Sequence, residues 1–399
     1  MARIQFREIE GRSGPFVALL AALALLVLAG LGAAWYMEHH GHYVTGMSNR
    51  IVWGAPHVFA VFLIVAASGA LNVASIASVF GRSPYKPLAR LSGLLAFALL
   101  AGGLSVLVLD LGRPDRLIVA MTHYNFKSVF AWNIFLYTGF FAVVAIYLWT
   151  MFERRMNVHT ERVGQIALVW RLVLTTGTGS IFGFIVARDA YNSALLAPLF
   201  IAMSFSFGLA VFVLILLAAY RGTGRDLGDA LLKRLGNLLG VFVAAVLYFV
   251  LVHHTTNVYV ARQHEVERFI LRDGGVYTAL FWIGQVAVGG VVPLVLLWAP
   301  GLGRFRIALA AACVIAGGLA QLYVLILGGQ AFPQTIFADK TTASSFFDGV
   351  VASYSPSLPE IALGVGGMAF ALTLTLVGLK VLPFLPLSLA DAKMESVTA

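Results

Sequence analysis

Long apolar runs separated by short polar gaps dominate this chain. A bilayer core of about 30 Å is spanned by a helix of about 20 apolar residues. Ten runs of this kind occur, at residues 15–37, 53–80, 88–109, 128–151, 165–187, 195–220, 236–256, 275–298, 305–328 and 359–384. The pattern predicts an all-α polytopic membrane protein of ten transmembrane helices, with residues 1–399 forming a single integral membrane domain.

Most gaps between the runs are short and hold glycine, proline and charged residues. The exception is the gap at 329–358, which contains Pro333 and Pro356 and is rich in Ser and Thr. A long gap in a compact protein is commonly functional. We therefore expect an extracytoplasmic loop at 329–358 that contacts a partner.

The composition excludes a soluble domain of any size. Hydrophobic residues make up 60% of the chain and charged residues 11%, whereas soluble domains carry about 25% charged residues. The net charge of +9 does not indicate nucleic-acid binding, because the Lys and Arg residues lie in short gaps rather than on one basic face. The single cysteine, Cys313, excludes a disulfide framework and a Cys-ligated iron–sulfur or zinc site within the chain.

The distribution of positive charge predicts the orientation. Of the 27 Lys and Arg residues, 18 fall on the side of the two termini and 9 on the other. The positive-inside rule then places both termini in the cytoplasm, with the protein in the cytoplasmic (inner) membrane. Residues 113–127 and 262–272 carry three basic residues each on the opposite side, so anionic partners or ligands are candidates there. No A-x-A cleavage site follows the first run, which we interpret as a retained helix.

Polar side chains inside membrane helices are costly, so their positions are informative. His57 lies near the start of the second run, Asp110 and Arg113 at the end of the third, Asn133 near the start of the fourth and Ser180 late in the fifth. Because successive helices run in opposite directions, these positions meet at one membrane face. We expect them to border a single pocket.

Each of these residues also has a simpler interpretation. His57 could be an interfacial histidine, and Asp110 with Arg113 could be an ion pair that closes a turn. Trp53 and Trp132 could belong to the aromatic belt of the membrane interface. The Thr and Ser residues of TTGTGS at 175–180 could bond to carbonyls of their own helix. Convergence from four helices favours the functional interpretation.

Other histidines suggest a metal or a haem. The segment EHHGHY at 38–43 could bind a metal, although exposed histidines without a supporting carboxylate are weak evidence. His253 and His254 end the seventh run on the same face as His57, and two imidazoles at equal depth suffice for a b-type haem.

A resemblance to a known family sharpens these alternatives. The stretch VLDLGRPDRLIVAMTHYNFKSVFAWNIFLYTGF resembles the signature of the NrfD/PsrC family, membrane subunits of quinone-linked oxidoreductases. Its marks are the Asp-Leu-Gly-Arg-Pro segment and the following Asn-x-x-Ser-x-x-x-Trp helix start. Segments on both sides, such as MEHHGHYVTGMSNRIVWGAPHVFAVFL and SYSPSLPEIALGVGG, are similar to the DsrP branch of the family, from the DsrMKJOP transmembrane complex of sulfur-metabolising prokaryotes.

The resemblance implies a fold, a ligand and partners. The fold is two four-helix bundles, here the second to fifth and the sixth to ninth runs, with an extra helix at each end. The ligand is a quinone, menaquinone or ubiquinone, in the first bundle near the periplasmic face, with no haem or metal in this chain. The partners are a periplasmic ferredoxin-like iron–sulfur subunit (DsrO-like), subunits like DsrM, DsrK and DsrJ, and membrane lipid, with no nucleic acid.

The resemblance also implies site residues. The family's quinone-binding histidine falls on His57, and its Asp-Leu-Gly-Arg-Pro segment on Asp110 and Arg113. The family's tyrosine in the fifth helix has no counterpart, and TTGTGS occupies that region. The implied cofactor-binding set is His57, Asp110, Arg113, Trp132, Asn133 and Ser180.

The sequence therefore favours a quinone- or quinol-interacting subunit of an electron-transfer complex linked to sulfur metabolism, which exchanges electrons with an iron–sulfur partner. Without a nucleotide or metal motif, this chain is not expected to complete a redox reaction alone. One alternative is a proton- or ion-translocating or transporter subunit without a redox role, with Arg171, Asn72, Gln285 and Gln321 along a path. Another is a membrane anchor that carries haem b.

Overall fold

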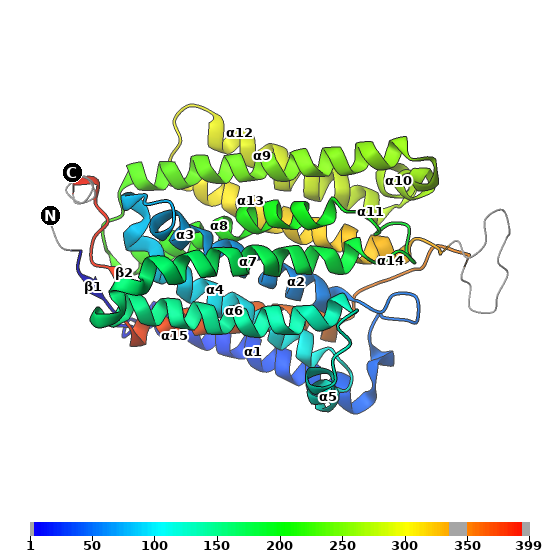
Figure 1. Ribbon diagram of the computed structural model, residues 1–399, viewed down its shortest axis with the longest axis horizontal. Coiled ribbons are helices and arrows are strands. Elements are labelled where there is room, and N and C mark those ends of the chain that lie inside the picture. The colour runs from blue at the N-terminus through cyan, green and yellow to red at the C-terminus, as the bar shows by residue number, and fades with distance from the viewer. Residues whose placement is uncertain (1–3, 335–348, 393–399) are drawn as a thin grey trace.

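The computed structural model describes residues 4–334 and 349–392, and most of these are helical. In this part of the chain, ten helices are long and apolar enough to cross a membrane. They run side by side along the long axis of the molecule (Figure 1). The prediction of an all-α polytopic membrane protein is confirmed.

Several spans are built from more than one helical segment. The spans comprise α1 (Gly14–His40), α2 (Ala55–Ala70) with α3 (Asn72–Ser78), α4 (Ala89–Leu109) after the short turn Ser83–Leu88, α6 (Val129–Phe152), α7 (Thr160–Gly183) after Arg154–His159, α8 (Leu196–Thr223), α9 (Asp229–Tyr259), α11 (Val276–Ala279) with the π-helix η7 (Leu280–Val291) and α12 (Val292–Trp298), α13 (Arg304–Tyr323) with the π-helix η8 (Val324–Gly328) and α14 (Gly329–Ala331), and α15 (Leu358–Val381). Shorter helices outside the spans are α5 (Leu117–Thr122) and α10 (His264–Arg268), the latter followed by the π-helix η6 (Phe269–Asp273).

The helices pack as two groups joined along a shared seam. In the first group α2 packs on α4 and α6 on α7, while α4 contacts α6. In the second, α8 packs on α9 and α13, and α13 packs on η7 and α12. The seam is formed by α8 against α2 and α7. Helices α1 and α15 pack on each other at the outside, and α15 also covers α4 and α2.

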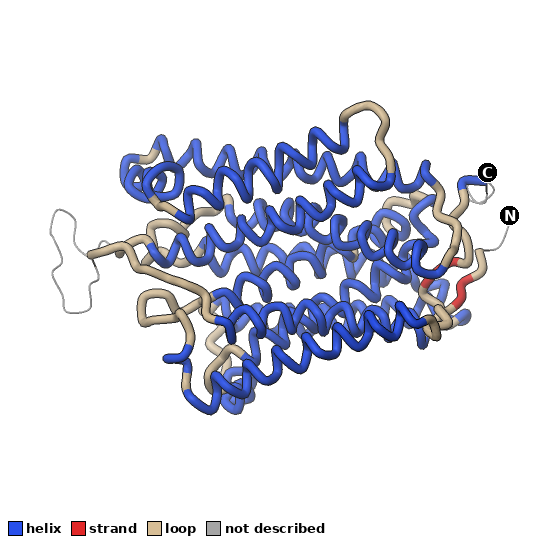
Figure 2. The backbone as a smooth tube through the Cα atoms, turned by 180° about the vertical axis from the view of Figure 1, so that it is seen from behind, coloured by secondary structure: helices blue, strands red, loops and turns tan. Residues whose placement is uncertain are grey.

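Both termini lie at one end of the molecule (Figure 1). There β1 (Phe6–Arg7) pairs antiparallel with β2 (Leu385–Pro386), a two-stranded sheet visible in Figure 2. We call the opposite end, where α2 begins and α4 ends, the distal end. The start of α6 and the end of α7 also lie there, so the distal end gathers the positions that the sequence predicted to share one face.

Most helix boundaries differ from the predicted runs by a few residues, and two of these differences have a clear cause or effect. Helix α9 begins at Asp229, ahead of the apolar run at 236–256, because its first turns carry charged residues that lower the hydropathy. The ninth span continues to Ala331, which shortens the loop predicted at 329–358. The backbone N–H of Ala352 bonds the carbonyl of Ala331 at 2.9 Å, and residues 335–348 of that loop lie outside the described part.

Candidate functional site

His57 and Asp110 meet at the distal end of the first bundle. His57 stands in the first turn of α2 and Asp110 directly follows the last residue of α4. Nδ1 of His57 lies 2.9 Å from Oδ2 of Asp110, and the Asp110 side chain is fully buried while that of His57 is 20% exposed. The ring N–H does not point along this line, so the contact is an ion-pair distance without hydrogen-bond alignment. The convergence that the sequence predicted for these two residues is present.

Local backbone features fix both members of the pair. Gly54 precedes α2 in an extended conformation, and Pro56 stands in the first turn, where its fixed φ suits a helix start. Gly112 turns the chain after α4 with a φ of 68°, a region that glycine enters without strain. The partial negative charge at the C-terminus of α4 repels the carboxylate of Asp110, whereas the partial positive charge at the N-terminus of α2 attracts it.

An aromatic wall stands beside the imidazole. The ring of Trp53 stacks on that of His57 with centroids 6.1 Å apart and planes at 26°. The Trp53 ring also contacts the ring of Phe182, edge-on with centroids 5.7 Å apart, and the ring of Tyr191, with centroids 6.5 Å apart. Burial raises the pKa of Tyr191 well above its usual range, so its hydroxyl stays protonated and donates to the carbonyl of Ile326 at 2.7 Å. The aromatic wall thus presents the apolar face of Trp53 to His57, and the hydrogen bond from Tyr191 to Ile326 fixes its other side.

The loop that carries Trp53 is fixed by Gln330 from the ninth span. Oε1 of Gln330 accepts from the backbone N–H groups of Val52 and Trp53 at 2.9 and 3.0 Å. Its Nε2 donates to the carbonyls of Trp53 and Ile326, both at 2.9 Å. Arg188 donates to the carbonyl of Gln330 at 2.9 Å. Sequence reasoning missed this role of Gln330, since no local signal joins residues so far apart in the chain.

A second support comes from the N-terminus of α15. Glu360 is fully buried and accepts from the backbone N–H groups of Gly46 and Ser357, each at 2.8 Å. Its other oxygen accepts from the hydroxyl of Tyr354 at 2.7 Å. That hydroxyl accepts in turn from the backbone N–H of Ala55 at 2.6 Å. The start of α15 thus holds the start of α2.

Arg113 does not approach the buried carboxylate. Its guanidinium forms a two-point pair with Asp115, at 3.0 and 2.9 Å, and both side chains are about 60% exposed or more. The hydrogen bond from Arg113 holds the pKa of Asp115 below its usual range. The ion pair with Asp110 considered from the sequence is therefore replaced by a surface pair one turn further on.

The remaining predicted residues are divided between the bundle interior and its surface. Asn133 is buried between α6 and α7 and donates to the carbonyls of Val129 and Gly177 at 2.9 and 3.3 Å, while its Oδ1 has no partner in the part of the chain that the structure describes. Ser180 is buried on α7. Trp132 is 49% exposed and donates to the carbonyl of Phe126 at 2.8 Å. Asn133 and Ser180 face the interior, whereas Trp132 belongs to the surface.

The other histidines are held by contacts of their own. His39 and His40 pack on aromatic rings one turn earlier in α1, and within residues 4–334 and 349–392 no three His, Cys, Asp or Glu side chains cluster as a metal site would require. In the second bundle, Nδ1 of His254 lies 2.7 Å from Oε2 of the buried Glu267. In both His254 and His57, therefore, Nδ1 lies close to a carboxylate oxygen of the same bundle.

Ten candidate membrane spans in the described part of the chain, with an imidazole–carboxylate pair at one end, define a polytopic membrane protein. The profile of the family described as "Polysulphide reductase, NrfD" matches residues 43–334. The chain belongs to this family. The matched region contains both bundles and leaves out α1 and α15.

Individual relatives cover most of the chain. It is 29% identical over 388 residues to the Hdr-like menaquinol oxidoreductase integral membrane subunit of Archaeoglobus fulgidus, covering 96% of this chain and 97% of the relative. It is 27% identical to the C subunit of polysulfide reductase from Wolinella succinogenes, over 71% of this chain and 96% of the relative. It is 22% identical to the menaquinone reductase integral membrane subunit of Nitratidesulfovibrio vulgaris, over 90% and 89%.

Proposed function

We propose that this chain is the quinone- or quinol-interacting membrane subunit of a multi-subunit electron-transfer complex, with the His57–Asp110 pair as its proton-exchanging group. The observation that carries the proposal is this pair, buried on the Asp110 side and partly exposed on the His57 side. The relatives named for menaquinol and menaquinone support a quinone as the ligand.

The chemistry of the pair suits a quinone. A quinol gives up two electrons and two protons when it is oxidised, and a quinone takes up the same number when it is reduced. With Nδ1 of His57 facing Asp110, its Nε2 is left to bond a quinone oxygen and to move a proton, since an imidazole nitrogen can both donate and accept one. The carboxylate of Asp110, 2.9 Å from Nδ1, attracts the imidazolium that a proton transfer would form.

Two buried oxygens add to the fit. Oδ1 of Asp110 and Oδ1 of Asn133 have no hydrogen-bond partner in the described part of the chain, and an unpaired buried acceptor is costly. A quinol hydroxyl is a donor that would satisfy such an acceptor. Trp53 offers the flat face against which a quinone ring stacks, and Ser180 is the candidate polar contact from α7.

The partners of the complex are proposed from the family resemblance. Electrons would pass one at a time between the quinone site and the iron–sulfur centres of a periplasmic ferredoxin-like subunit (DsrO-like), in a complex with DsrM-, DsrK- and DsrJ-like subunits that serves sulfur metabolism. This assignment puts both termini in the cytoplasm and the distal end in the periplasm. The exposed Arg113 and Trp132 then belong to the docking surface, together with the loop at 329–358.

A second candidate function is ion translocation, which the buried charges favour. Arg171 lies within α7, is 1% exposed and bonds Oδ1 of Asn72 at 2.9 Å, while its Nε and Nη1 have no partner in the described part of the chain. An ionisable side chain inside a membrane bundle commonly marks an ion or substrate pathway. Measuring protons moved per electron in vesicles that contain the complex separates this function from simple quinone chemistry.

The primary test is quinol-dependent electron transfer in the purified complex. His57→Ala should abolish reduction of the iron–sulfur partner by quinol while the subunits still copurify. The matched control is His159→Ala, because His159 is exposed at the opposite end of the bundle. Turnover by His57→Ala equal to that of the control would contradict the proposal.

A further inference from the structure

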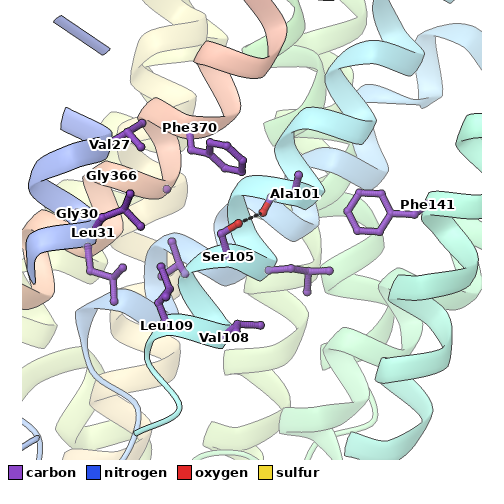
Figure 3. A pocket seen from close by; sticks show the side chains of 14 residues that line it. Val27, Gly30, Leu31, Ala101, Ser105, Val108, Leu109, Phe141, Gly366 and Phe370 are labelled. Atoms are coloured by element: carbon purple, nitrogen blue, oxygen red, sulfur yellow. Dashed lines mark hydrogen bonds between the residues drawn. The ribbon is translucent and has the colours of Figure 1, made fainter. Parts of the chain in front are cut away.

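A cavity of about 520 Å³ lies between α1, α4, α6 and α15. Leu31 of α1, Ala101 and Ser105 of α4, Phe141 of α6 and Phe370 of α15 line it, as Figure 3 shows. Its volume falls in the range of sites that hold small organic ligands, about 300–1,000 Å³. Two of its walls, α1 and α15, lie outside the region that the family profile matches.

The lining accepts only an apolar ligand. Ser105 carries the one polar side chain among the described residues that line the cavity, and its hydroxyl donates to the carbonyl of Ala101 in its own helix at 2.7 Å (Figure 3). These residues therefore present no spare side-chain donor, and a polar group placed among them would lose its hydrogen bonds to water.

Close helix contacts fix the shape of the cavity. A Cβ atom added to Gly30 of α1 would lie 2.9 Å from Cα of Gly366 in α15, and one added to Gly102 of α4 would lie 2.7 Å from the carbonyl oxygen of Gly367. Small residues of this kind let membrane helices approach closely. Backbone contacts thus hold the helices that form the walls at a fixed, close spacing.

The cavity reaches the end of α4 that carries the His57–Asp110 pair. Leu109 lines it and directly precedes Asp110. A Cβ added to Gly103 would meet the carbonyl of Ala60 on α2, so this side of α4 faces α2, and Asp110 lies seven residues further along the same side. Ser105 lines the cavity from the other side of α4. Leu109, next to Asp110 in the chain, therefore borders the cavity at the same end of α4 as the pair.

We propose that this cavity binds the isoprenoid tail of the quinone whose ring occupies the His57–Asp110 site, an inference that rests on the proposed function. A quinone ring attached to a long apolar chain needs both a polar contact and an apolar channel, and the two features meet at the end of α4. Helices α1 and α15 then have a direct role, since they form the tail channel beside the two bundles.

Filling the cavity tests the assignment. In the intact complex, Ser105→Phe should raise the KM for a long-chain menaquinol by about tenfold, equivalent to about 1.4 kcal/mol, because the ring of Phe would occupy the channel. The KM for menadiol, which has the same ring system without a tail, should stay within about twofold of the wild-type value. Leu28→Phe is the control, because Leu28 lies on α1 with its side chain 63% exposed.

Three outcomes would overturn the inference. Equal KM changes for both quinols would show a general disturbance of the head-group site, and unchanged KM values for both would show that the tail lies elsewhere. If Ser105→Phe loses bound phospholipid on extraction but keeps its KM for the long-chain quinol, the channel holds a lipid acyl chain. If the wild-type complex oxidises neither quinol, the proposed function itself fails. Leu31→Trp provides a second filling variant from α1.

Discussion

The side-chain amide of Gln330 pairs with the backbone of Trp53 in both directions, accepting from its N–H at 3.0 Å and donating to its carbonyl oxygen at 2.9 Å. Gln330 therefore acts as an additional peptide group against the segment that leads into α2. Because Trp53 stacks on His57, the ninth span determines where the aromatic wall of the first bundle stands.

Removing this amide should loosen the candidate site. Gln330→Ala leaves the backbone N–H groups of Val52 and Trp53 without their acceptor, which costs about 1–3 kcal/mol for a buried group. We expect a lower thermal unfolding midpoint and a higher KM for quinol. The control is Gln334→Ala, whose side chain is exposed, and equal shifts in the two variants would show that Gln330 has no special role.

Asp110 and Arg113 should behave differently although they share one sequence motif. Asp110→Asn removes the charge that faces His57, and we expect quinol-dependent turnover to fall by about 100-fold or more, the range for loss of a group that assists proton transfer. Arg113→Gln breaks an exposed pair with Asp115, and such a pair contributes little because solvent screens it. With an artificial electron acceptor, which bypasses the docking surface, Arg113→Gln should retain wild-type turnover. A comparable loss in both variants would place Arg113 in the site.

Tyr354 should contribute stability that depends on pH. Burial, followed by the hydrogen bond to Glu360, raises the pKa of Tyr354 far above its ordinary value of 10.0. A tyrosine whose pKa is higher in the folded state stabilises the fold fully below the unfolded pKa and loses that contribution as the pH rises above it. Tyr354→Phe should therefore lower the free energy of unfolding by about 1–3 kcal/mol at neutral pH.

The difference between wild type and Tyr354→Phe should shrink as the pH rises above about 10. Denaturation followed at a series of pH values measures this. Tyr259→Phe, at a side chain 89% exposed, is the matched control and should show neither effect. A difference that is constant with pH would mean that the Tyr354 hydroxyl ionises as freely in the folded protein as in the unfolded chain.

The buried charge of Arg171 should lower the stability of the folded protein. Its guanidinium is buried, with Asn72 as its hydrogen-bonded partner in the described part of the chain, and it stacks over the ring of Phe205 at 5.0 Å. Replacing a buried ion pair with apolar side chains of similar volume is often neutral or stabilising, by about 1–4 kcal/mol, and the same desolvation cost applies to a lone buried charge. Arg171→Met should therefore leave the unfolding midpoint unchanged or raise it, with Arg162→Met, on the exposed start of α7, as the control. A clear fall would reveal a compensating group around the guanidinium.

The sequence predicted the fold well because membrane spans are evident from local composition. The meeting of His57 with Asp110 was also predictable, since the direction of successive helices places the start of α2 beside the end of α4. The partner of Arg113 was not predictable, because an arginine that lies in a turn between Asp110 and Asp115 can reach either carboxylate. Asp115, lying in the same exposed turn, pairs with it without the cost of burying a second charge.

The supports of the site were outside the reach of sequence reasoning. Gln330 and Glu360 contact the segment before α2 from positions hundreds of residues away. Glu360 does show a local signal, since Ser357 three residues earlier forms a capping box with it. That signal predicts a helix start but not that the same carboxylate also accepts from Gly46.

The pairing of α1 with α15 has a consequence for how the protein is made. Among the described spans, α1 is synthesised first, yet its main packing partner, α15, is synthesised last. Until that span inserts, the glycine surface around Gly30 faces lipid, and β1 has no strand to pair with. Assembly of the described spans therefore includes a late step, in which α15 joins α1 and completes the wall of the cavity beside α4. A product truncated before α15 would lack the main packing partner of α1 and the helix that covers α4 and α2.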